Sequence, residues 1–399
     1  MAGDDPAAPS ALFTRGASCT ITVQSVAGTV GPGLSTEKGL VMTNKARVAV
    51  GMSGGVDSTI TAMMLKEQGY EVSGAMMAIW DKDHSFDMKQ ANACYGPNEV
   101  QKVQKARELA EKLGIPFAVI DLSVAFRSRV LDYCREEYLG GRTPNPCVRC
   151  NHTMKFGELW EGIVASGFPF DYFATGHYVR KVLLDNGRWA LRKGADPKKD
   201  QSYFLYALTQ DQLSRTLFPL GEMEKTQVKA RASELGLGFE KVKESQNFIT
   251  GGYEILFEGR CSVGTIVDES GMVLGRHEGV WNYTVGQRKG LGISSEHPLY
   301  VVALDAKANT VTVGPREHLY KAGFIVKNTT WMAEEALTGE RRLFTKIRYG
   351  HPGAIAMVKP LADGSVAVEF ETPQLSITPG QVAVFYDDET LFGGGYIEG

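Results

Sequence analysis

The sequence lacks features that mark whole classes of protein. No apolar run approaches the roughly 20 residues that a membrane-spanning helix needs. The formal net charge is only −3, so the chain has no global attraction to nucleic acid, and any RNA contact must use local basic patches. Six cysteines in 399 residues are few and irregularly spaced, which disfavours a secreted disulfide framework. We therefore expect a cytoplasmic protein with reduced thiols.

The N-terminal stretch also lacks something, namely the apolar core of a secretory signal peptide. Residues 1–41 are instead rich in Gly, Ala, Ser and Thr. We interpret them as a disordered extension or a misassigned start, because Met42 directly precedes the first convincing strand. The length of 399 residues predicts two or three domains.

Strand and helix patterns alternate in the first half of the chain. Buried strands are expected over Arg47–Met52 and Glu71–Met77, and again in the segments "IPFAVIDL" and "DYFATGHY". Helices are expected over Thr59–Gln68, in "NEVQKVQKARELAEKLG" with Asn98 as cap and Gly114 as stop, and through Val130, Leu131 and Cys134. Such alternation predicts an α/β fold with an N-terminal doubly wound parallel sheet, covered by helices on both faces.

The pattern changes after about Leu205. Short helices are expected around Asp211–Leu217 and Lys225–Leu235, which indicates a small central domain. After about Pro298 the chain becomes strand-rich, with hairpins in "PLYVVALDAKANTVTVG" and "AIAMVKPLADGSVAVEFE". This indicates a C-terminal antiparallel β-barrel. The expected domains are 42–208, 209–297 and 298–399.

The stretch "SGGVDS", Ser53 to Ser58, lies between the first expected strand and helix. Glycines allow the backbone to approach an anion, and a helix N-terminus offers free N–H groups. Asp57 would repel a bare phosphate, so it indicates either a Mg²⁺ bridge or a capping role. The stretch lacks Gly-Lys-Ser/Thr and is not the usual ATP P-loop. The plain structural alternative is a Gly-rich turn with a capping Ser or Asp.

A second motif is the Cys-x-x-Cys of "GGRTPNPCVRCNHTMKFG", formed by Cys147 and Cys150. Arg149, His152 and Lys155 surround Cys150 in the sequence, and positive neighbours are expected to lower the pKa of its thiol. The motif alone is equally typical of half a zinc site, a redox pair or a pair of cluster ligands.

These motifs carry a family resemblance. "SGGVDS" resembles the PP-loop of ATP pyrophosphatases, written SGGxDS, which grips pyrophosphate and releases it from ATP. The Cys-x-x-Cys loop, "ATGHY", "KDQSYFLY", "YTVGQRKGLGI", "RYG" and "TPGQ" follow in the order seen in tRNA-specific 2-thiouridylases. From Lys45 to its C-terminus the sequence is similar to that family, whose three domains match the expected architecture.

The resemblance implies an enzyme, an ATP-dependent tRNA-uridine 2-sulfurtransferase. Such an enzyme adenylates the C2 oxygen of the wobble uridine, releases pyrophosphate, and transfers sulfur from a cysteine persulfide with release of AMP. It implies ATP and Mg²⁺, the tRNAs for lysine, glutamate and glutamine, and a sulfur donor such as a cysteine desulfurase or sulfur-relay protein. Two alternatives remain: another PP-loop ligase or amidotransferase acting on a small carbonyl substrate, and a non-thiolating tRNA-binding relative.

The resemblance also assigns roles to residues. The nucleotide would be held by Gly51, Met52, Ser53, Gly54, Gly55, Val56, Asp57, Ser58, Met77 and Gly176. The target base would lie against Asn145, Pro146 and Cys147, with Cys150 as nucleophile. The remaining tRNA contacts would come from His177, Lys199, Asp200, Gln201, Arg348, Tyr349 and Gln381. From residue types alone, His177 is as typical of a packing histidine and Arg348 of a surface ion pair.

One departure from the family affects the sulfur chemistry. Many members carry a second cysteine in a stretch written roughly S-x-D-I-C-F, but "ESQNFITGG" has none, and Ile249 stands about where it would fall. Conversely, Cys147 stands where those members have Asp. Cys147 and Cys150 would then form a persulfide relay, or would ligate an iron–sulfur cluster with Cys94 or Cys261 as third ligand.

Overall fold

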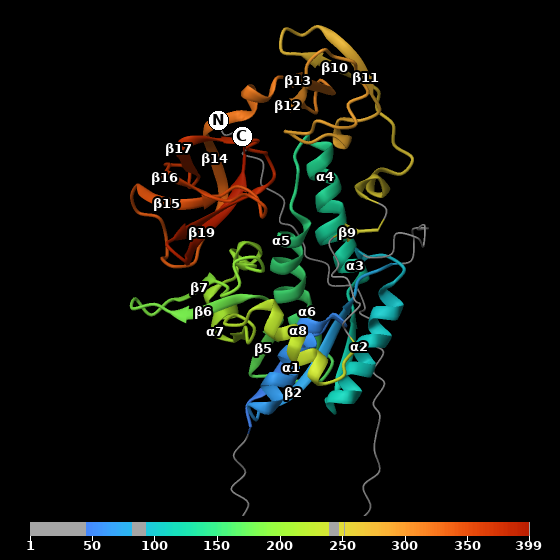
Figure 1. The fold of residues 1–399 in the computed structure, drawn as a ribbon, viewed down its shortest axis with the longest axis vertical. Helices are drawn as coiled ribbons and strands as arrows, with labels where there is room; N and C mark the ends of the chain where they lie inside the picture. The colour runs from blue at the N-terminus through green and yellow to red at the C-terminus, as the bar shows by residue number, and fades with distance from the viewer. Residues whose placement is uncertain (1–44, 82–92, 239–246, 251, 399) are drawn as a thin grey trace, which may run out of the picture.

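The computed structural model describes residues 45–81, 93–238, 247–250 and 252–398 (Figure 1). The expected N-terminal extension lies outside the described residues, as does part of "ESQNFITGG". None of the described helices is both long enough and apolar enough to cross a membrane.

The N-terminal domain is built on a parallel sheet. Its strands run in the order β4-β2-β1-β5-β8 and span Phe117–Asp121, Glu71–Ala78, Arg47–Gly51, Tyr172–Thr175 and Thr216–Leu217. Alternate residues of β1 face opposite sides, so Val48 and Val50 belong to one core cluster and Ala49 to another. All four expected strands of this sheet are present, and β8 extends it at one edge.

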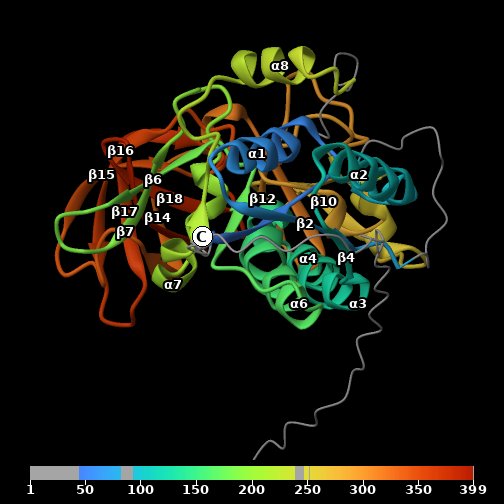
Figure 2. The ribbon, with the colours of Figure 1, turned by 90° about the horizontal axis from the view of Figure 1, so that it is seen from below.

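Helices cover both faces of this sheet (Figure 2). Helices α1 (Val56–Glu67), α2 (Glu99–Leu113) and α8 (Lys225–Glu234) pack on the face of Val48 and Val50. Helix α6 (Leu159–Ala165) packs on the opposite face against β2 and β4, while α4 (Tyr133–Leu139) extends away from the sheet toward the central domain (Figure 1). Gly114 ends α2 in the left-handed conformation as predicted, whereas the side chain of Asn98 makes no capping hydrogen bond. The doubly wound arrangement is therefore confirmed.

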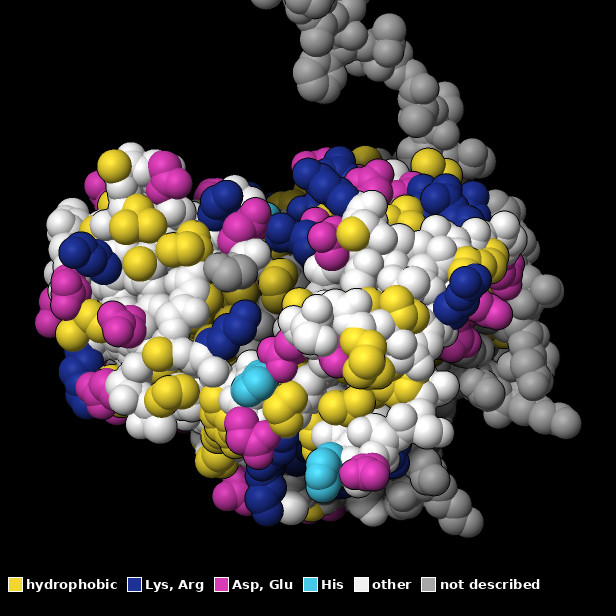
Figure 3. Space-filling view, turned by 90° about the horizontal axis from the view of Figure 1, so that it is seen from above, with side chains coloured by type: hydrophobic (Ala, Val, Ile, Leu, Met, Phe, Trp, Pro, Cys, Tyr) yellow, Lys and Arg dark blue, Asp and Glu magenta, His cyan; other side chains and the backbone are white. Residues whose placement is uncertain are grey.

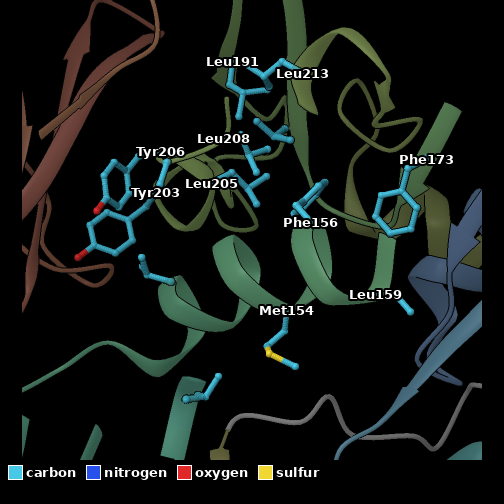
Figure 4. Packing of buried hydrophobic residues seen from close by; sticks show 14 of the residues in the cluster. Met154, Phe156, Leu159, Phe173, Leu191, Tyr203, Leu205, Tyr206, Leu208 and Leu213 are labelled. Atoms are coloured by element: carbon cyan, nitrogen blue, oxygen red, sulfur yellow. The ribbon is translucent and has the colours of Figure 1, made fainter. Parts of the chain in front are cut away.

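Shorter elements connect these layers and lead to the two motifs. They are β3 (Ala93–Tyr95), α3 (Ser123–Phe126), the π-helical η2 (Arg127–Asp132), α5 (Pro146–Cys150), the π-helical η3 (Asn151–Glu158), η4 (Ser202–Leu205), α7 (Gln210–Ser214), β9 (Asn247–Ile249) and η5 (Tyr253–Phe257). Buried hydrophobic side chains beneath α5 and η3 join the sheet to the segment around Tyr203 (Figure 4).

The central domain contains a small sheet in the order β11-β10-β13-β12. Its strands are β11 (Val273–His277), β10 (Gly264–Asp268), β13 (Thr310–Gly314) and β12 (Tyr300–Asp305), with the short η6 (Val280–Asn282) and η7 (Arg316–Leu319) beside them. The first predicted hairpin forms β12 and β13 of this sheet, so it does not belong to the barrel. The expected domain boundary at 208–209 separates β5 from β8 in the sequence, although these two strands pair in one sheet.

The C-terminal domain is a closed antiparallel β-barrel. Its order is β14-β17-β16-β15-β18-β19, and pairing of β14 with β19 closes it. The strands are β14 (Tyr320–Trp331), β15 (Arg341–Lys346), β16 (Ala354–Pro360), β17 (Val366–Leu375), β18 (Val382–Asp387) and β19 (Thr390–Ile397). The second predicted hairpin forms β16 and β17. The predicted fold class, a parallel α/β sheet followed by a small central domain and a barrel, is confirmed.

A seam joins the N-terminal domain to the barrel. The hairpin β6 (Val179–Leu183) and β7 (Trp189–Lys193) continues the barrel sheet beside β19. The hydroxyl of Tyr203 donates to the carbonyl of Val382 at 2.9 Å. The barrel is therefore held against the segment that follows the end of β5.

Candidate active site

The SGGVDS loop runs from the end of β1 into the first turn of α1. Gly54 has a positive φ of 71°, and a Cβ there would lie 2.9 Å from the backbone oxygen of Lys102. Only glycine fits where α2 passes this close. The amide of Ser53 donates to the hydroxyl of Ser58 at 3.2 Å, which closes the loop on itself. The loop thus presents its backbone at the N-terminus of a 12-residue helix, a geometry suited to anions.

Asp57 does not cap α1. The helix begins after Gly55 without a side-chain capping bond. Instead both carboxylate oxygens of Asp57 accept bonds from Nζ of Lys225 at 2.7 Å, and one also accepts from the hydroxyl of Tyr178 at 2.7 Å. The predicted capping role is therefore wrong, and the oxygens that a Mg²⁺ bridge would use are held by an ammonium group. These side chains do not form a magnesium site in this arrangement.

Gly176 lies directly against the loop. A Cβ at Gly176 would stand 2.9 Å from the backbone carbon of Asp57 and 2.9 Å from the nitrogen of Ser58, so the end of β5 touches the loop only because this residue is glycine. Met77 lies near the carboxyl end of β2, half-buried against the core. The sequence-predicted nucleotide residues therefore gather at the carboxyl edge of the sheet, where ligands of such folds bind.

The Cys-x-x-Cys motif lies on the short helix α5. The side-chain oxygen of Asn145 accepts from the amide of Val148 at 3.1 Å and caps the helix, and Pro146 occupies its first turn. Val148 is buried, Cys147 is solvent-exposed, and Cys150 is half-buried at the junction with the π-helical η3. The motif is thus helical, with its two thiols near the end of a rigid element.

The thiol of Cys150 is not the low-pKa group expected from its sequence neighbours. Burial raises its pKa to about 12, and of the three expected cations only Lys155 opposes this shift. Arg149 instead donates to the carbonyl of Arg129 at 3.0 Å and lies over the ring of Tyr133. The pKa of His152 is lowered by burial and by Arg149, which keeps the imidazole neutral. Cys150 is therefore a protonated thiol in the free protein.

A third cysteine belongs to this neighbourhood. Strand β3, which carries Cys94, pairs with β9 so that Tyr95 lies opposite Ile249. Burial raises the pKa of both Cys147 and Cys150, and the charge of a Cys94 thiolate would add to that shift, which places Cys94 in their neighbourhood. Nevertheless, no group of three His, Cys, Asp or Glu residues is placed to hold a metal ion within 45–81, 93–238, 247–250 and 252–398. The three thiols therefore do not form a cluster site as they stand.

The π-helical η3 connects the thiols with the loop. It continues α5 beyond Cys150, and the ring centroid of Phe156 on it lies 6.2 Å from that of His177. His177 directly follows Gly176, the residue that touches the SGGVDS loop. The two motifs that the sequence analysis singled out thus belong to one site.

The predicted tRNA residues occupy different surroundings. His177 is only 7% exposed; its Nδ1 is bonded to the hydroxyl of Thr175 at 2.8 Å, and burial lowers its pKa well below the usual value. This is the packing histidine that residue types alone suggested. Gln201 accepts from the amide of Tyr178, while Asp200 accepts from Gly194 and Ser202. The Lys199–Gln201 turn is thus packed against the segment after His177.

The other predicted tRNA residues come from the barrel. Arg348 is half-buried and donates to the carbonyls of Leu375 and Ser376, rather than pairing with a carboxylate. Tyr349 is 40% exposed, and its ring centroid lies 4.4 Å from that of Phe204. Gln381 donates to the carbonyls of Thr143 and Pro144. Gln381 therefore borders the loop that leads into α5, while Arg348 and Tyr349 contact other segments.

Charge on the outer surface is mixed. On the face seen in Figure 3, Lys and Arg side chains lie in small groups among Asp and Glu rather than in one broad patch. This agrees with the net charge of −3 and with RNA contact through local basic groups.

Sequence reasoning missed Lys225 and Tyr178 as members of the site. Tyr178 stood inside the quoted "ATGHY", and Lys225 in a segment assigned to the central domain. Lys225 is separated from Asp57 by 168 residues. The available signal was the absence of a lysine from the loop itself, which required a cation from elsewhere.

Comparisons with known proteins agree with this architecture. The family model described as tRNA methyl transferase HUP domain matches residues 46–250. The tRNA methyl transferase PRC-barrel domain matches 258–315, and the aminomethyltransferase beta-barrel domain matches 321–397. Among solved structures, the U34-tRNA thiolase NcsA from Methanococcus maripaludis aligns at 17% identity with a TM-score of 0.33, covering 52% of this chain and 62% of that one.

Curated relatives match over nearly the whole chain. The tRNA-specific 2-thiouridylase MnmA of Endomicrobium trichonymphae is 44% identical over 361 residues, covering 89% of this chain and all of that protein. The enzyme of the same name from Geotalea uraniireducens is 45% identical over 367 residues, covering 90% of this chain and 97% of that one. Identity of this degree over the full length of the relatives shows that the chain belongs to the tRNA-specific 2-thiouridylase MnmA family.

Proposed function

We propose that this chain is an ATP-dependent tRNA 2-thiouridylase acting on the wobble uridine of lysine, glutamate and glutamine tRNAs. The observation that carries the proposal is the junction between the SGGVDS loop and the Cys-x-x-Cys helix: Gly176 touches the loop, and the ring of the next residue, His177, lies 6.2 Å from that of Phe156 on the element that continues α5. A nucleotide bound by the loop and a base lying against α5 would then share one site. A tRNA substrate also implies that the enzyme works in the cytoplasm.

The loop supports the first chemical step. The C2 carbonyl of uracil is a poor electrophile, and its oxygen is a poor leaving group. Attack of that oxygen on the α-phosphorus of ATP forms a C2–O–AMP bond, and pyrophosphate leaves with the electron pair of the broken P–O bond. The backbone N–H groups at the N-terminus of α1 are placed to bind the departing anion.

The thiols support the second step. A persulfide on Cys150 attacks C2, and AMP departs with the former carbonyl oxygen. A second thiolate then attacks the sulfur of Cys150, which leaves the outer sulfur on uridine and forms an enzyme disulfide. Cys147 lies three positions before Cys150 on the same helix, and Cys94 belongs to the same neighbourhood. A cellular thiol must reduce the disulfide, and a cysteine desulfurase or relay protein must restore the persulfide.

Cys94 could replace the cysteine that many family members carry near the position of Ile249. The strand pairing β3–β9 sets Tyr95 opposite Ile249, so Cys94 belongs to the neighbourhood where the missing cysteine would stand. We therefore assign Cys94 and Cys147 as candidate resolving thiols. A persulfide relay is favoured over an iron–sulfur cluster because the three thiols are not arranged around a common metal position in the described part of the chain.

The base must reach this site from a single-stranded loop, turned out of its stack. Asn145 and Pro146 fix the start of α5, and Gln381 of the barrel bonds the loop before it. We propose that Arg348 and Tyr349 contact the tRNA from the same domain. Turning out a base costs a few kcal/mol, which contacts from Lys and Arg to phosphates offset.

Two measurements test the proposal. Mass spectrometry of tRNA nucleosides from cells with and without the gene should show 2-thiouridine derivatives only when the gene is present. The purified protein should release pyrophosphate and AMP from ATP in the presence of Mg²⁺ and unmodified tRNA. Release of ADP would reject the loop assignment, and unchanged thiouridine in the deletion strain would reject the proposed function.

A further inference from the structure

The SGGVDS loop contains no lysine, so only its backbone N–H groups are available to attract a polyphosphate. The negative charge of Asp57 repels the same polyphosphate, and the loop therefore needs a cation from another segment. The structure contains such a cation at the N-terminus of α8. Nζ of Lys225 lies 2.7 Å from each carboxylate oxygen of Asp57, which is itself a residue of the SGGVDS loop. Lys225 is 6% exposed, so it is not a solvated surface lysine.

Several contacts fix Lys225 in place. Its backbone amide donates to Asp196 at 3.1 Å, and its ammonium lies 5.5 Å from the ring centroid of Tyr178. Glu224 begins the helix in a capping box with Gln227. The next turn of α8 buries Val228 in the core cluster that contains α1. The ammonium is therefore held at the loop by the fold.

Stability alone gives little reason for this ion pair. A buried pair must repay the desolvation of both charges, and an apolar pair of similar volume is often as stable. A site for an anion gives a direct reason, since Asp57 neutralises the ammonium while the loop is empty. When a polyphosphate arrives, phosphate oxygens supply the negative charge, and Asp57 still bonds the hydroxyl of Tyr178.

We propose that Lys225 is the phosphate-binding cation of the SGGVDS loop, held ready by Asp57 and specific for the pyrophosphate portion of the nucleotide. The inference rests on the proposed function and deepens it. Lys225 stabilises the negative charge that develops on pyrophosphate as its bond to the α-phosphorus breaks.

The test measures binding of inorganic pyrophosphate and of AMP to the full chain by calorimetry. Lys225→Met should weaken pyrophosphate about 10- to 100-fold, the range of a charge-assisted hydrogen bond, and leave AMP within about twofold. Lys229→Met is the matched control, because Lys229 is an exposed lysine of the same helix and should change neither affinity. Equal pyrophosphate affinity of Lys225→Met and the unmodified protein would overturn the proposal.

A second comparison separates phosphate binding from support of Asp57. Asp57→Asn alone should bind pyrophosphate at least as tightly as the unmodified protein, because repulsion is removed and Lys225 remains. Adding Lys225→Met to Asp57→Asn should then weaken binding about 10- to 100-fold. If the double variant binds like Asp57→Asn, Lys225 only supports Asp57 and the proposal fails. This comparison decides the matter even if Lys225→Met alone does not fold, because the pair is removed together. Absence of tRNA thiolation would affect neither binding result, so the two proposals fail separately.

Discussion

The side-chain nitrogen Nε2 of Gln381 donates to the backbone oxygen of Thr143 at 2.9 Å, which links the barrel to the loop that precedes the Cys-x-x-Cys helix. A residue expected to contact tRNA thus also positions the protein's own backbone. Gln381→Leu should lower kcat/KM for thiolation about 10-fold, since one to two hydrogen bonds are lost, and should leave ATP binding unchanged. Gln104→Leu, at an exposed position of α2, is the control. Unaltered kinetics of Gln381→Leu would show that the loop holds its conformation without this bond.

Asp57 is the loop residue that organises the cation. Asp57→Ala should slow pyrophosphate release in the presence of tRNA by ~10²–10³, because alanine, unlike asparagine, has no side-chain oxygen to orient the ammonium of Lys225 toward the departing pyrophosphate. The measurement is single-turnover release of pyrophosphate and AMP. A rate within about threefold of the unmodified enzyme would contradict a role for Asp57 in this step.

Arg348 tests the barrel as an RNA surface. Arg348→Ala should weaken tRNA binding and reduce the slope of log affinity against log salt by about one unit, the loss of one phosphate contact. ATP binding should not change. Arg342→Ala is the control, because Arg342 is exposed on the same barrel and paired with Glu371. Since Arg348 also bonds the carbonyls of Leu375 and Ser376, thermal melting must accompany the titration. A slope equal to that of the control rejects the contact.

The cysteines separate the two sulfur-carrying schemes. Cys150→Ser should abolish thiolation but still release pyrophosphate, because in the proposed mechanism adenylation precedes attack. Cys147→Ser and Cys94→Ser should each slow thiolation, with complete loss only when both are changed if either can resolve the adduct. Cys261→Ser is the control, at an exposed site in the central domain. Anaerobic purification adds a direct observation: a colourless active protein supports the persulfide relay, and a brown one with about four irons supports a cluster.

The raised pKa of Cys150 predicts how its reactivity and the stability of the protein change with pH. Its thiol has a pKa of about 12 in the folded protein against a usual 9.0, so the native state keeps the proton that the unfolded chain releases. Alkylation of Cys150 should therefore be slow near neutral pH and rise about tenfold per pH unit through about pH 10. The free energy of unfolding should therefore fall as the pH rises from about 9 to 12, and it should fall less in Cys150→Ser. A plateau in the alkylation rate below about pH 9 would contradict the burial of this thiol.

Features formed by residues that are close together in the sequence were predictable. The SGGVDS loop and the Cys-x-x-Cys helix each lie within a few residues, and the strand that leads into the loop has an unambiguous buried pattern. Local turn chemistry was predictable too, as Gly114 shows at the end of α2. Such features depend on neighbours along the chain, which a single sequence displays directly.

Features that depend on tertiary packing were not predictable. The cation at the loop comes from Lys225, 168 residues away from Asp57, and a lysine at the start of a helix has no local mark of burial. Cys94 reaches the thiols through the short pairing of β3 with β9. The effect of Arg149 on Cys150 was misjudged because proximity in sequence does not fix direction, and its guanidinium points to Arg129 and Tyr133 instead.

The hairpin β6–β7 affects whether the N-terminal domain and the barrel can be produced as separate fragments. Because β7 continues the barrel sheet beside β19, cutting the chain between the N-terminal domain and the barrel would expose backbone donors and acceptors on both fragments. Separately expressed halves would then carry open strand edges prone to self-association. The barrel therefore shares a sheet with the N-terminal domain rather than being an appended module, and its Gln381 can help to position the loop before the Cys-x-x-Cys helix.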